Sequence, residues 1–331
     1  MTNQTAISVR NLKVYFSAGK GQVVHAVDGV SFDIPAGSAF GLVGESGSGK
    51  TTAALACARL VDVTSGDIRL GQTDITTLSG EKMRQARRDI QVVFQDPYAS
   101  LNPRERVGSI VRRPMDLMKI GTPNERDKRV DDLFATVGLR PEQKVLFPHQ
   151  FSGGQRQRIG IARALATHPK LIICDEPVSA LDVAIQAQIL NLLVRLKSQM
   201  GLSYLFISHD LAVVQHLCDR IAVMYLGQIV EIGSRREIFN KPMHPYTMAL
   251  ISALPALEVG LVADGRIRLQ GDPPSPLSPP KGCRFAGRCA FSIDICHDTN
   301  PVLTIEGGTH AVACHRTSDP AVVAARKALF N

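Results

Sequence analysis

Apolar positions along this chain fall into short runs that alternate with segments of helical spacing. The runs over residues 39–43 and 171–174 carry no charge, which is typical of strands buried on both faces. Residues 7–43 predict strands joined by turns, and residues 152–232 predict alternating helices and strands. This alternation predicts an α/β domain on a mainly parallel sheet that helices cover.

Residues 104–150 have apolar side chains three and four positions apart, which predicts helices. The apolar members of this pattern are Val130, Leu133, Phe134 and Val137. After about residue 233 the alternation stops, and residues 272–280 hold too many prolines for a helix or a sheet. We expect a stiff, extended arm there. The chain therefore predicts a main domain over residues 1–235 and an extension over residues 236–331.

Composition and charge limit the partners. The chain has 331 residues, long for one compact core, and a net charge of +8. Its basic clusters, such as Arg84, Arg87 and Arg88, have no interleaved aromatic residues, and the chain has no Trp, so we expect no nucleic-acid partner. No apolar run reaches the ~18 residues that span a bilayer, and no leader pattern opens the chain. We expect it to stay in the cytoplasm and to reach a membrane only through a partner.

A glycine-rich loop follows the first buried run and matches G-x-x-x-x-G-K-[ST]. In this pattern backbone N–H groups converge on a phosphate chain at the start of a helix. We expect Lys50 to reach the β- and γ-phosphates and Thr51 to ligate Mg²⁺. A plain glycine turn is the alternative, and the Lys-Thr pair argues against it. The predicted nucleotide-binding residues here are Gly44, Glu45, Ser46, Gly47, Ser48, Gly49, Lys50, Thr51 and Thr52.

Two carboxylates, Asp175 and Glu176, close the second buried run. The carboxyl ends of parallel strands form the edge where α/β proteins place their sites. There Asp175 can bind Mg²⁺, and Glu176 can polarise the attacking water as a general base. A pair of solvated carboxylates is the plainer interpretation, but it explains the pair less well beside a phosphate-binding loop.

A second anion-binding helix start is predicted at residues 151–165. Its N-cap and first turn fall on Ser152, Gly153, Gly154 and Gln155, where backbone N–H groups face outward. Taken alone, these residues fit an ordinary helix cap. A single nucleotide site needs no second helix start of this kind, whereas the nucleotide of a facing partner would use it.

Four of the seven cysteines, Cys283, Cys289, Cys296 and Cys314, lie in the extension. Five, six and seventeen residues separate them, wider than the close pairs of a zinc site. Disulfides are rare in the cytoplasm. Four widely spaced thiolates suit an iron–sulfur cube, and four unligated thiols in a compact tail are the alternative.

In their order along the chain, these motifs resemble those of the ATP-binding subunits of ABC transporters. The resemblance implies a P-loop fold of the ABC type with an antiparallel β subdomain, and a helical subdomain at about residues 100–165 that meets a membrane permease. It implies that an aromatic residue stacks on adenine, and we choose Phe16, although spacing alone does not separate it from Tyr15. It adds a Q-loop glutamine, a D-loop and a switch histidine at Gln95, Ser179, Ala180, Leu181, Asp182 and His209.

The resemblance also implies roles. Thr51, Gln95 and Asp175 would hold Mg²⁺, Glu176 would activate water, and His209 would contact the γ-phosphate and stabilise the transition state. Residues 152–155 would cover the ATP of a facing subunit, so that two subunits close over two nucleotides.

The extension resembles the C-terminal region of peptide-importer ATPases, the oligopeptide/dipeptide branch, through His244-Pro245-Tyr246-Thr247, the proline arm and residues 283–289. Residues 92–103 and 177–182 resemble its F-type subunit. The resemblance implies ATP and Mg²⁺, a D-type ATP-binding partner, two permease subunits, and indirectly a periplasmic or extracellular solute-binding protein. It places the chain on the cytoplasmic face of the inner membrane. It also implies a 4Fe–4S cluster on the four cysteines, with zinc or no metal as alternatives.

Three alternative functions have to be weighed. Relatives in this branch also move nickel, sugars and other small solutes. Non-transport ABC ATPases usually carry two cassettes or a long coiled-coil insertion, and this chain has neither. The peptide-importer extension argues against the ATPase of an exporter.

Overall fold

A computed structural model describes residues 4–19, 21–254, 267 and 269–330 of the chain. The chain forms two compact units. The first consists of Met1–Ser8, Asp33–Ser38 and Arg69–Phe206, and the second of Val9–Phe32, Ala39–Ile68 and Ile207–Asn331. Four strands have residues in both units: β1 (Thr5–Ser17), β2 (Val23–Pro35), β4 (Ser65–Leu70) and β8 (Ser203–Ser208).

The first unit contains a parallel pair of strands and several helices. Strand β6 (Ile90–Val93) pairs in parallel with β7 (Leu171–Asp175), which places Val93 beside Cys174. Every residue of β7 is buried, and the uncharged run over residues 171–174 predicted this for all but the last. The other elements of this unit are β5 (Thr73–Asp74), α2 (Gly80–Asp89), α3 (Val107–Leu117), α4 (Pro123–Thr136), η1 (Pro141–Val145), η2 (Pro148–Gln150), α5 (Gly153–Leu165) and α6 (Val183–Met200).

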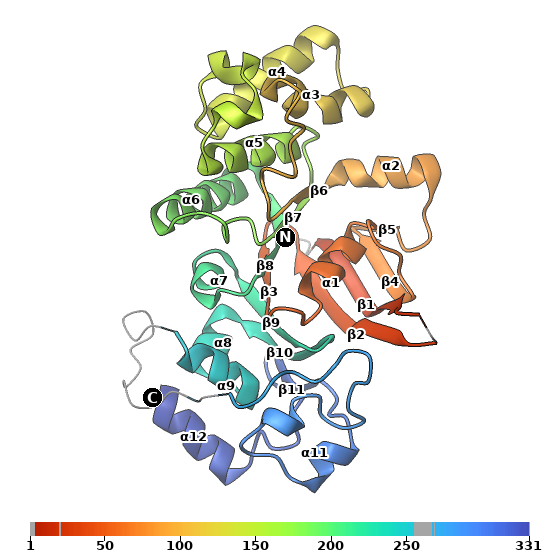
Figure 1. Cartoon of the computed structure of the whole chain (residues 1–331), viewed down its shortest axis with the longest axis vertical. Coiled ribbons are helices and arrows are strands. Elements are labelled where there is room, and N and C mark those ends of the chain that lie inside the picture. Colours follow the sequence, from red (N-terminus) through yellow and green to blue (C-terminus); the bar gives the residue numbers. More distant parts are fainter. Residues whose placement is uncertain (1–3, 20, 255–266, 268, 331) are drawn as a thin grey trace. The chain divides into compact units, whose positions relative to one another are not determined.

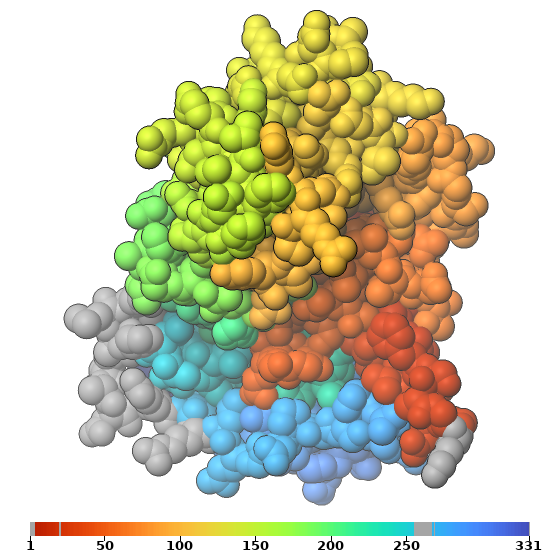
Figure 2. Space-filling model, turned by 45° about the horizontal axis from the view of Figure 1, so that its top comes forward, coloured from red at the N-terminus to blue at the C-terminus, as the bar shows by residue number. Residues whose placement is uncertain are grey.

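Helices α3, α4 and α5 pack against one another and form a helical subdomain (Figure 1). Its residues are the yellow and yellow-green atoms of Figure 2. Val130, Leu133 and Phe134 are buried on α4, so the helical pattern read from residues 104–150 is confirmed.

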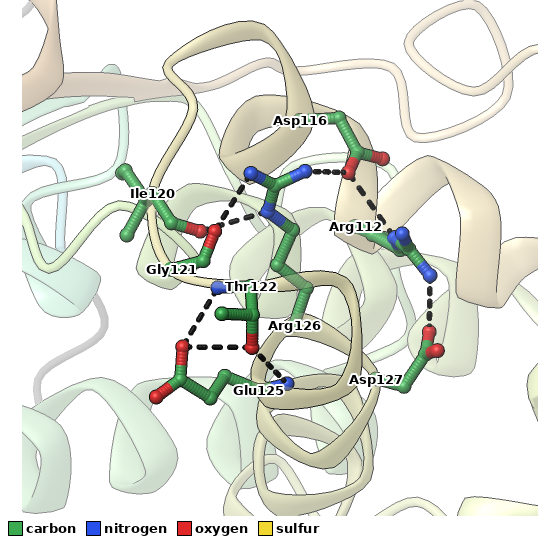
Figure 3. A network of polar contacts seen from close by, with 8 residues as sticks. All are labelled: Arg112, Asp116, Ile120, Gly121, Thr122, Glu125, Arg126 and Asp127. Atoms are coloured by element: carbon green, nitrogen blue, oxygen red, sulfur yellow. Dashed lines mark hydrogen bonds and ion pairs between the residues drawn. The ribbon is translucent and has the colours of Figure 1, made fainter.

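A polar network fixes the turn between α3 and α4 (Figure 3). Arg126 donates to the carbonyl oxygens of Ile120 and Gly121, both at 2.8 Å. The same guanidinium pairs with Asp116 at 2.8 Å, and Arg112 pairs with that carboxylate at 3.2 Å. The turn carbonyls therefore have charged donors, which hold the two helices in one geometry.

The start of α4 is closed by a capping box, in which Thr122 and Glu125 satisfy each other's backbone N–H groups. The Thr122 N–H donates to the Glu125 carboxylate at 2.7 Å. The Glu125 N–H donates to the Thr122 hydroxyl at 3.4 Å. The cap leaves fewer unpaired donors at the first turn of α4.

One sheet of the second unit has strands in the order β11 (Thr304–Gly307), β12 (His310–Val312), β10 (Gln228–Ser234), β9 (Arg220–Tyr225) and β3 (Ala39–Val43). Strands β3 and β9 are parallel, and the other pairs are antiparallel. Strand β12 of the extension pairs with β10, so the extension continues this sheet. Most of β1, β2 and β4 also lies in this unit, and these strands belong to a second sheet with the order β2-β1-β4-β5. The helices of this unit are α1 (Lys50–Cys57), α7 (Leu211–Leu217), α8 (Arg235–Asn240), α9 (Pro245–Ser252), η3 (Ala286–Arg288), α11 (Asp294–Asp298) and α12 (Pro320–Phe330).

The proline-rich run over residues 272–280 forms neither helix nor strand within the described structure, as predicted. It runs beside β2, where the His25 N–H donates to the Pro276 carbonyl at 3.1 Å. Figure 2 shows the blue residues of the extension against the red residues of the first strands.

A buried carboxylate anchors the extension to β10. Glu231 is fully buried and accepts hydrogen bonds from the N–H groups of Met243 at 2.7 Å and His244 at 2.9 Å. His310 Nε2 lies 2.7 Å from the same side chain. One carboxylate therefore binds both the start of α9 and strand β12. These contacts offset the free-energy cost of burying its oxygen atoms.

We predict that replacing Thr122 with Ala lowers the free energy of unfolding by about 1 kcal/mol, because the first turn of α4 loses its cap. Urea unfolding of the full chain measures this loss. Thr122→Ser is the matched control, since it keeps the hydroxyl and should unfold within about 0.5 kcal/mol of the unmutated chain. Equal losses in both variants would contradict the capping role.

Candidate nucleotide site

The glycine-rich loop joins β3 to α1, the strand–loop–helix order that the sequence predicted. Three of its glycines have positive φ: +150° at Gly44, +77° at Gly47 and +97° at Gly49. A Cβ on Gly44 would lie 2.1 Å from the Met224 carbonyl oxygen, and one on Gly49 would lie 2.0 Å from that of Ala26. Only glycine fits at these two positions.

The loop wraps around the ammonium of Lys50, whose side chain is buried. Lys50 Nζ donates to the carbonyl oxygens of Glu45 at 2.7 Å and Gly44 at 2.9 Å, and lies 3.4 Å from Ser48 Oγ. The positive charge is thus already held inside the loop where a phosphate would meet it. Ser46, Gly47 and Thr51 are exposed, and Thr52 is half-buried.

Glu45 of this loop is held by the extension. Its N–H donates to the hydroxyl of Tyr246 on α9 at 2.9 Å. Its carboxylate accepts two bonds from Arg288 Nη1, at 2.9 and 3.1 Å. The extension therefore contacts the nucleotide-binding loop through both backbone and side chain.

The two aromatic candidates for adenine stacking lie at the end of β1 and differ in their surroundings. The hydroxyl of Tyr15 donates to Asp28 at 2.6 Å, and its ring centroid is 4.3 Å from that of His25. Burial and the bond to Asp28 raise the pKa of Tyr15 to about 12. The neighbouring Phe16 is 43% exposed. Tyr15 is engaged within the protein, whereas the Phe16 ring has a face open for a ligand.

His209 follows the last residue of β8 and is exposed. The next residue, Asp210, caps α7 by accepting a hydrogen bond from the Ala212 N–H at 2.9 Å. His209 thus lies at the junction between a buried strand and a helix, as the glycine-rich loop does between β3 and α1.

Gln95 and Glu176 meet in the first unit. They follow the carboxyl ends of the parallel neighbours β6 and β7. Gln95 Nε2 donates to Glu176 Oε2 at 3.1 Å and lies 3.5 Å from Ser179 Oγ. Glu176 has a φ of +45°, which is uncommon for a residue with a Cβ.

Asp175, the last residue of β7, is buried, with 6% of its surface exposed. It immediately precedes Glu176, so one strand end presents both carboxylates, as the sequence predicted.

Ser152 is the N-cap of α5, and Gln155 completes a capping box with it. The Gln155 N–H donates to Ser152 Oγ at 3.3 Å, and the Ser152 N–H donates to Gln155 Oε1 at 3.0 Å. A Cβ on Gly154 would lie 2.4 Å from Ile185 Cγ2, and one on Gly153 would lie 3.3 Å from Leu181 Cδ2. The residues 152–155 therefore pack directly on the segment that contains the D-loop.

The D-loop, residues 179–182, leads into α6. Asp182 caps this helix by accepting from the Ile185 N–H at 2.9 Å. Ser179, Ala180 and Asp182 are exposed, Leu181 is half-buried, and the adjacent Val183 is 81% exposed.

The segment after Gln95 is attached to α5, a link that the sequence did not predict. The guanidinium of Arg156 lies 3.5 Å above the centre of the Tyr98 ring. Arg163 Nη1 donates to the Ser100 carbonyl at 2.5 Å. Two cationic side chains thus connect the Q-loop segment to α5, the helix that Ser152 caps.

The four cysteines of the extension line one cavity, together with His244, Phe285 and Phe291. Burial raises the pKa of Cys289 to about 11 and that of Cys314 to about 12, so these groups are protonated thiols at neutral pH. In the described residues, no group of three or more His, Cys, Asp or Glu side chains is placed so that it could hold a metal ion. The other three cysteines, Cys57, Cys174 and Cys218, are buried.

Comparisons with known proteins agree with this fold and these motifs. Residues 27–179 match the family described as ABC transporter. The ATP-binding cassette MJ0796, solved as a dimer in a post-hydrolysis state with ADP and Pi, is similar with a TM-score of 0.64 and 29% identity, over 70% of this chain and 99% of that one. The protein cbiO1 from Clostridium perfringens, part of the transporter complex cbiONQ, gives a TM-score of 0.63 and 28% identity over 72% of this chain and 92% of that one. The fold and its motifs are those of an ABC ATPase, which binds and hydrolyses ATP with Mg²⁺.

Longer matches include the extension. Residues 230–296 match the family described as oligopeptide/dipeptide transporter, C-terminal region. The oligopeptide transport ATP-binding protein AppF of Bacillus subtilis is 49% identical over 320 residues, covering 94% of this chain and 97% of AppF. The corresponding protein OppF of Salmonella typhimurium is 48% identical over 320 residues, covering 93% and 95%. The chain belongs to the ATP-binding subunits of the oligopeptide/dipeptide branch of ABC transporters.

Sequence reasoning missed the contacts that Tyr246 and Arg288 make with Glu45. Their only signal was that both lie in segments, residues 244–247 and 283–289, that resembled the peptide-importer branch. No helix in the described part of the chain is long and apolar enough to cross a bilayer.

We predict that Gly154→Ala destabilises the full chain by about 1–3 kcal/mol, because the new methyl group overlaps Ile185. Ile185→Ala in the same chain should recover part of this loss, since it removes the Cγ2 atom that the methyl group meets. The measurement is thermal or urea unfolding of both variants.

Gly160 on the same helix is the matched control, because a Cβ there has nothing within 4 Å. Gly160→Ala should leave stability unchanged or raise it by about 0.5–1 kcal/mol. Equal effects at Gly154 and Gly160 would contradict the packing assigned to Gly154.

Proposed function

We propose that this chain is the F-type ATP-hydrolysing subunit of a transporter that imports dipeptides or oligopeptides. One observation carries the proposal: a single chain combines the ABC motifs with the oligopeptide/dipeptide C-terminal region, over nearly the full length of relatives named as oligopeptide transport proteins. The lack of a spanning helix among the described residues is consistent with attachment to the inner membrane through the permease, on its cytoplasmic face.

In this function the glycine-rich loop holds the triphosphate of ATP. Its N–H groups and Lys50 bind the β- and γ-phosphates. Thr51, Gln95 and Asp175 would ligate Mg²⁺, which neutralises the charge that develops during phosphoryl transfer. Phe16 would stack on adenine, which its exposed ring supports.

Glu176 is the proposed general base. Its Oε2 atom accepts a hydrogen bond from Gln95 at 3.1 Å, which links the Q-loop glutamine directly to the proposed base. Gln95 in turn begins the segment that Arg156 and Arg163 attach to α5. His209 would donate to the γ-phosphate and stabilise the transition state.

The remaining motif residues of this chain would contact a partner subunit and its nucleotide. Ser152, Gly153, Gly154 and Gln155 would cover the ATP of a D-type subunit, and residues 179–182 would line the same interface. The exposure of Ser179, Ala180 and Asp182 supports this assignment. The helical subdomain would meet one of two permease subunits, and a solute-binding protein would deliver the peptide to them from outside.

We further propose that Cys283, Cys289, Cys296 and Cys314 hold a 4Fe–4S cluster with a structural role. The donor set fits, because four thiols line one cavity and thiolates are the ligands of such clusters. The side chains as placed do not form a site for a metal ion, so ligation requires them to move and to lose their protons. When bound, the cluster would cross-link residues 283, 289, 296 and 314 and stabilise the extension.

We predict that Glu176→Gln keeps ATP binding and removes most ATP hydrolysis and peptide uptake by the assembled complex in vesicles. A general base contributes about 10²–10⁴-fold to its step. Glu306→Gln, an exposed change on β11, is the control and should leave both rates unchanged. Hydrolysis by the Glu176→Gln complex at the unmutated rate would refute the assignment, and hydrolysis without uptake of any peptide by the unmutated complex would refute the substrate.

We predict that anaerobically purified chain contains about four iron and four sulfide per molecule. Cys314→Ser should lose both and lower the unfolding temperature, because the extension loses its cross-link. Cys218→Ala, in the core and outside the cavity, should keep the iron. If metal analysis finds one zinc per chain, the site binds zinc and the cluster proposal is wrong. If it finds no metal, the four thiols are unligated and the proposal is wrong as well.

A further inference from the structure

The segment between the first two cysteines of the extension reaches the phosphate-binding loop. We call residues 283–289 the cysteine loop; its middle forms η3. Arg288, one residue before Cys289, donates through Nη1 to both carboxylate oxygens of Glu45, at 2.9 and 3.1 Å. The Arg288 side chain is only 9% exposed and that of Glu45 26%, so the pair is largely shielded from water. Shielding makes such a pair stronger than a surface ion pair.

A second group of the extension holds the same residue. Tyr246 is fully buried, and its hydroxyl accepts the Glu45 N–H at 2.9 Å. Its own N–H donates to His244 Nδ1 at 3.0 Å. Tyr225 of β9 completes the contact, because Arg288 Nη1 lies 3.3 Å from its hydroxyl. Glu45 is therefore fixed at both its backbone and its side chain.

The cysteine loop is itself tied down at its other end. Arg284, next to Cys283, is 7% exposed. It donates to the Leu226 carbonyl and to the carboxylate of Asp28. Asp28 also accepts the hydroxyl of Tyr15. One short loop thus contacts the phosphate-binding loop with one arginine. With the other it contacts Asp28 of β2, the residue that accepts the Tyr15 hydroxyl.

The charge of Glu45 gives the contact a consequence for ligand binding. The Glu45 carbonyl oxygen lies 2.7 Å from Lys50 Nζ, the group that the phosphates would meet. A carboxylate on the same residue repels a triphosphate unless a nearby cation cancels it. Arg288 is placed to do so.

We propose that Arg288 is a positioning residue of the ATP site. It holds Glu45 in place and neutralises its charge, so that the ATP affinity of this chain depends on the cysteine loop. The inference rests on the proposed function, because it assigns Arg288 to the ATP site of that function. Arg288 acts through Glu45, and the chemistry of hydrolysis stays with the residues already described.

The test measures MgATP affinity of the full chain by calorimetry for Arg288→Gln, Glu45→Gln and the double variant. Arg288→Gln should weaken binding by about tenfold or more, because an uncompensated carboxylate remains in the loop. Removing that carboxylate as well should restore affinity to within a few-fold of the unmutated chain. A merely structural role for Arg288 would not produce this recovery.

Arg316→Gln is the matched control. Its side chain also stabilises the extension, donating to the Phe291 carbonyl at 2.7 Å and pairing with Asp319, but it makes no contact with Glu45. Its ATP affinity should be unchanged. Should Arg288→Gln fail to fold, Arg288→Lys keeps the charge and should bind ATP more tightly than Arg288→Ala.

Two results would overturn the proposal: unchanged affinity in Arg288→Gln, or a double variant that binds as weakly as the single one. In the assembled complex, the change should raise the KM for ATP and leave kcat nearly unchanged. A failure of the proposed function is distinguishable, because it would show as a lack of peptide uptake by the unmutated complex while the affinities of the isolated chain still follow the pattern above.

Discussion

The second unit depends on one constraint: the backbone of the phosphate-binding loop lies directly against the backbones of β9 and β2. Gly44 and Gly49 lie so near the carbonyl oxygens of Met224 and Ala26 that no larger residue fits. Strands β9 and β2 must therefore keep fixed places beside the loop. The Gly227 N–H donates to the Ser48 carbonyl at 2.9 Å, which adds a bond across the same contact. The extension then secures this arrangement from outside through Glu231, Tyr246 and the cysteine loop.

Much of the fold was predictable because local chemistry determines it. Uncharged runs became the buried strands β3 and β7, and the spacing of Leu133 and Phe134 placed them on the inner face of α4. Ser152 was expected at a helix N-cap and is one. These features depend on residues a few positions apart, so one sequence contains all the information they need.

Contacts between distant segments were not predictable in the same way. Glu45 and Arg288 are separated by 243 positions, and they meet because β12 pairs with β10 and brings the extension to the sheet. The pairing of Gly154 with Ile185 likewise depends on how α5 packs beside α6. Spacing could not separate Tyr15 from Phe16 either, since the difference lies in Asp28 and His25, which belong to another strand.

The cap of α5 shows why a particular residue type suits position 152. Ser, Asp and Asn cap helices about equally well, and the Ser152 oxygen accepts the Gln155 N–H as any of them would. A hydroxyl differs from a carboxylate in that it still has a hydrogen to donate while its oxygen accepts. An aspartate there would cap the helix but present a negative charge to any anion approaching the helix start. Serine is uncharged, so the helix can be capped while its first turn remains attractive to an anion.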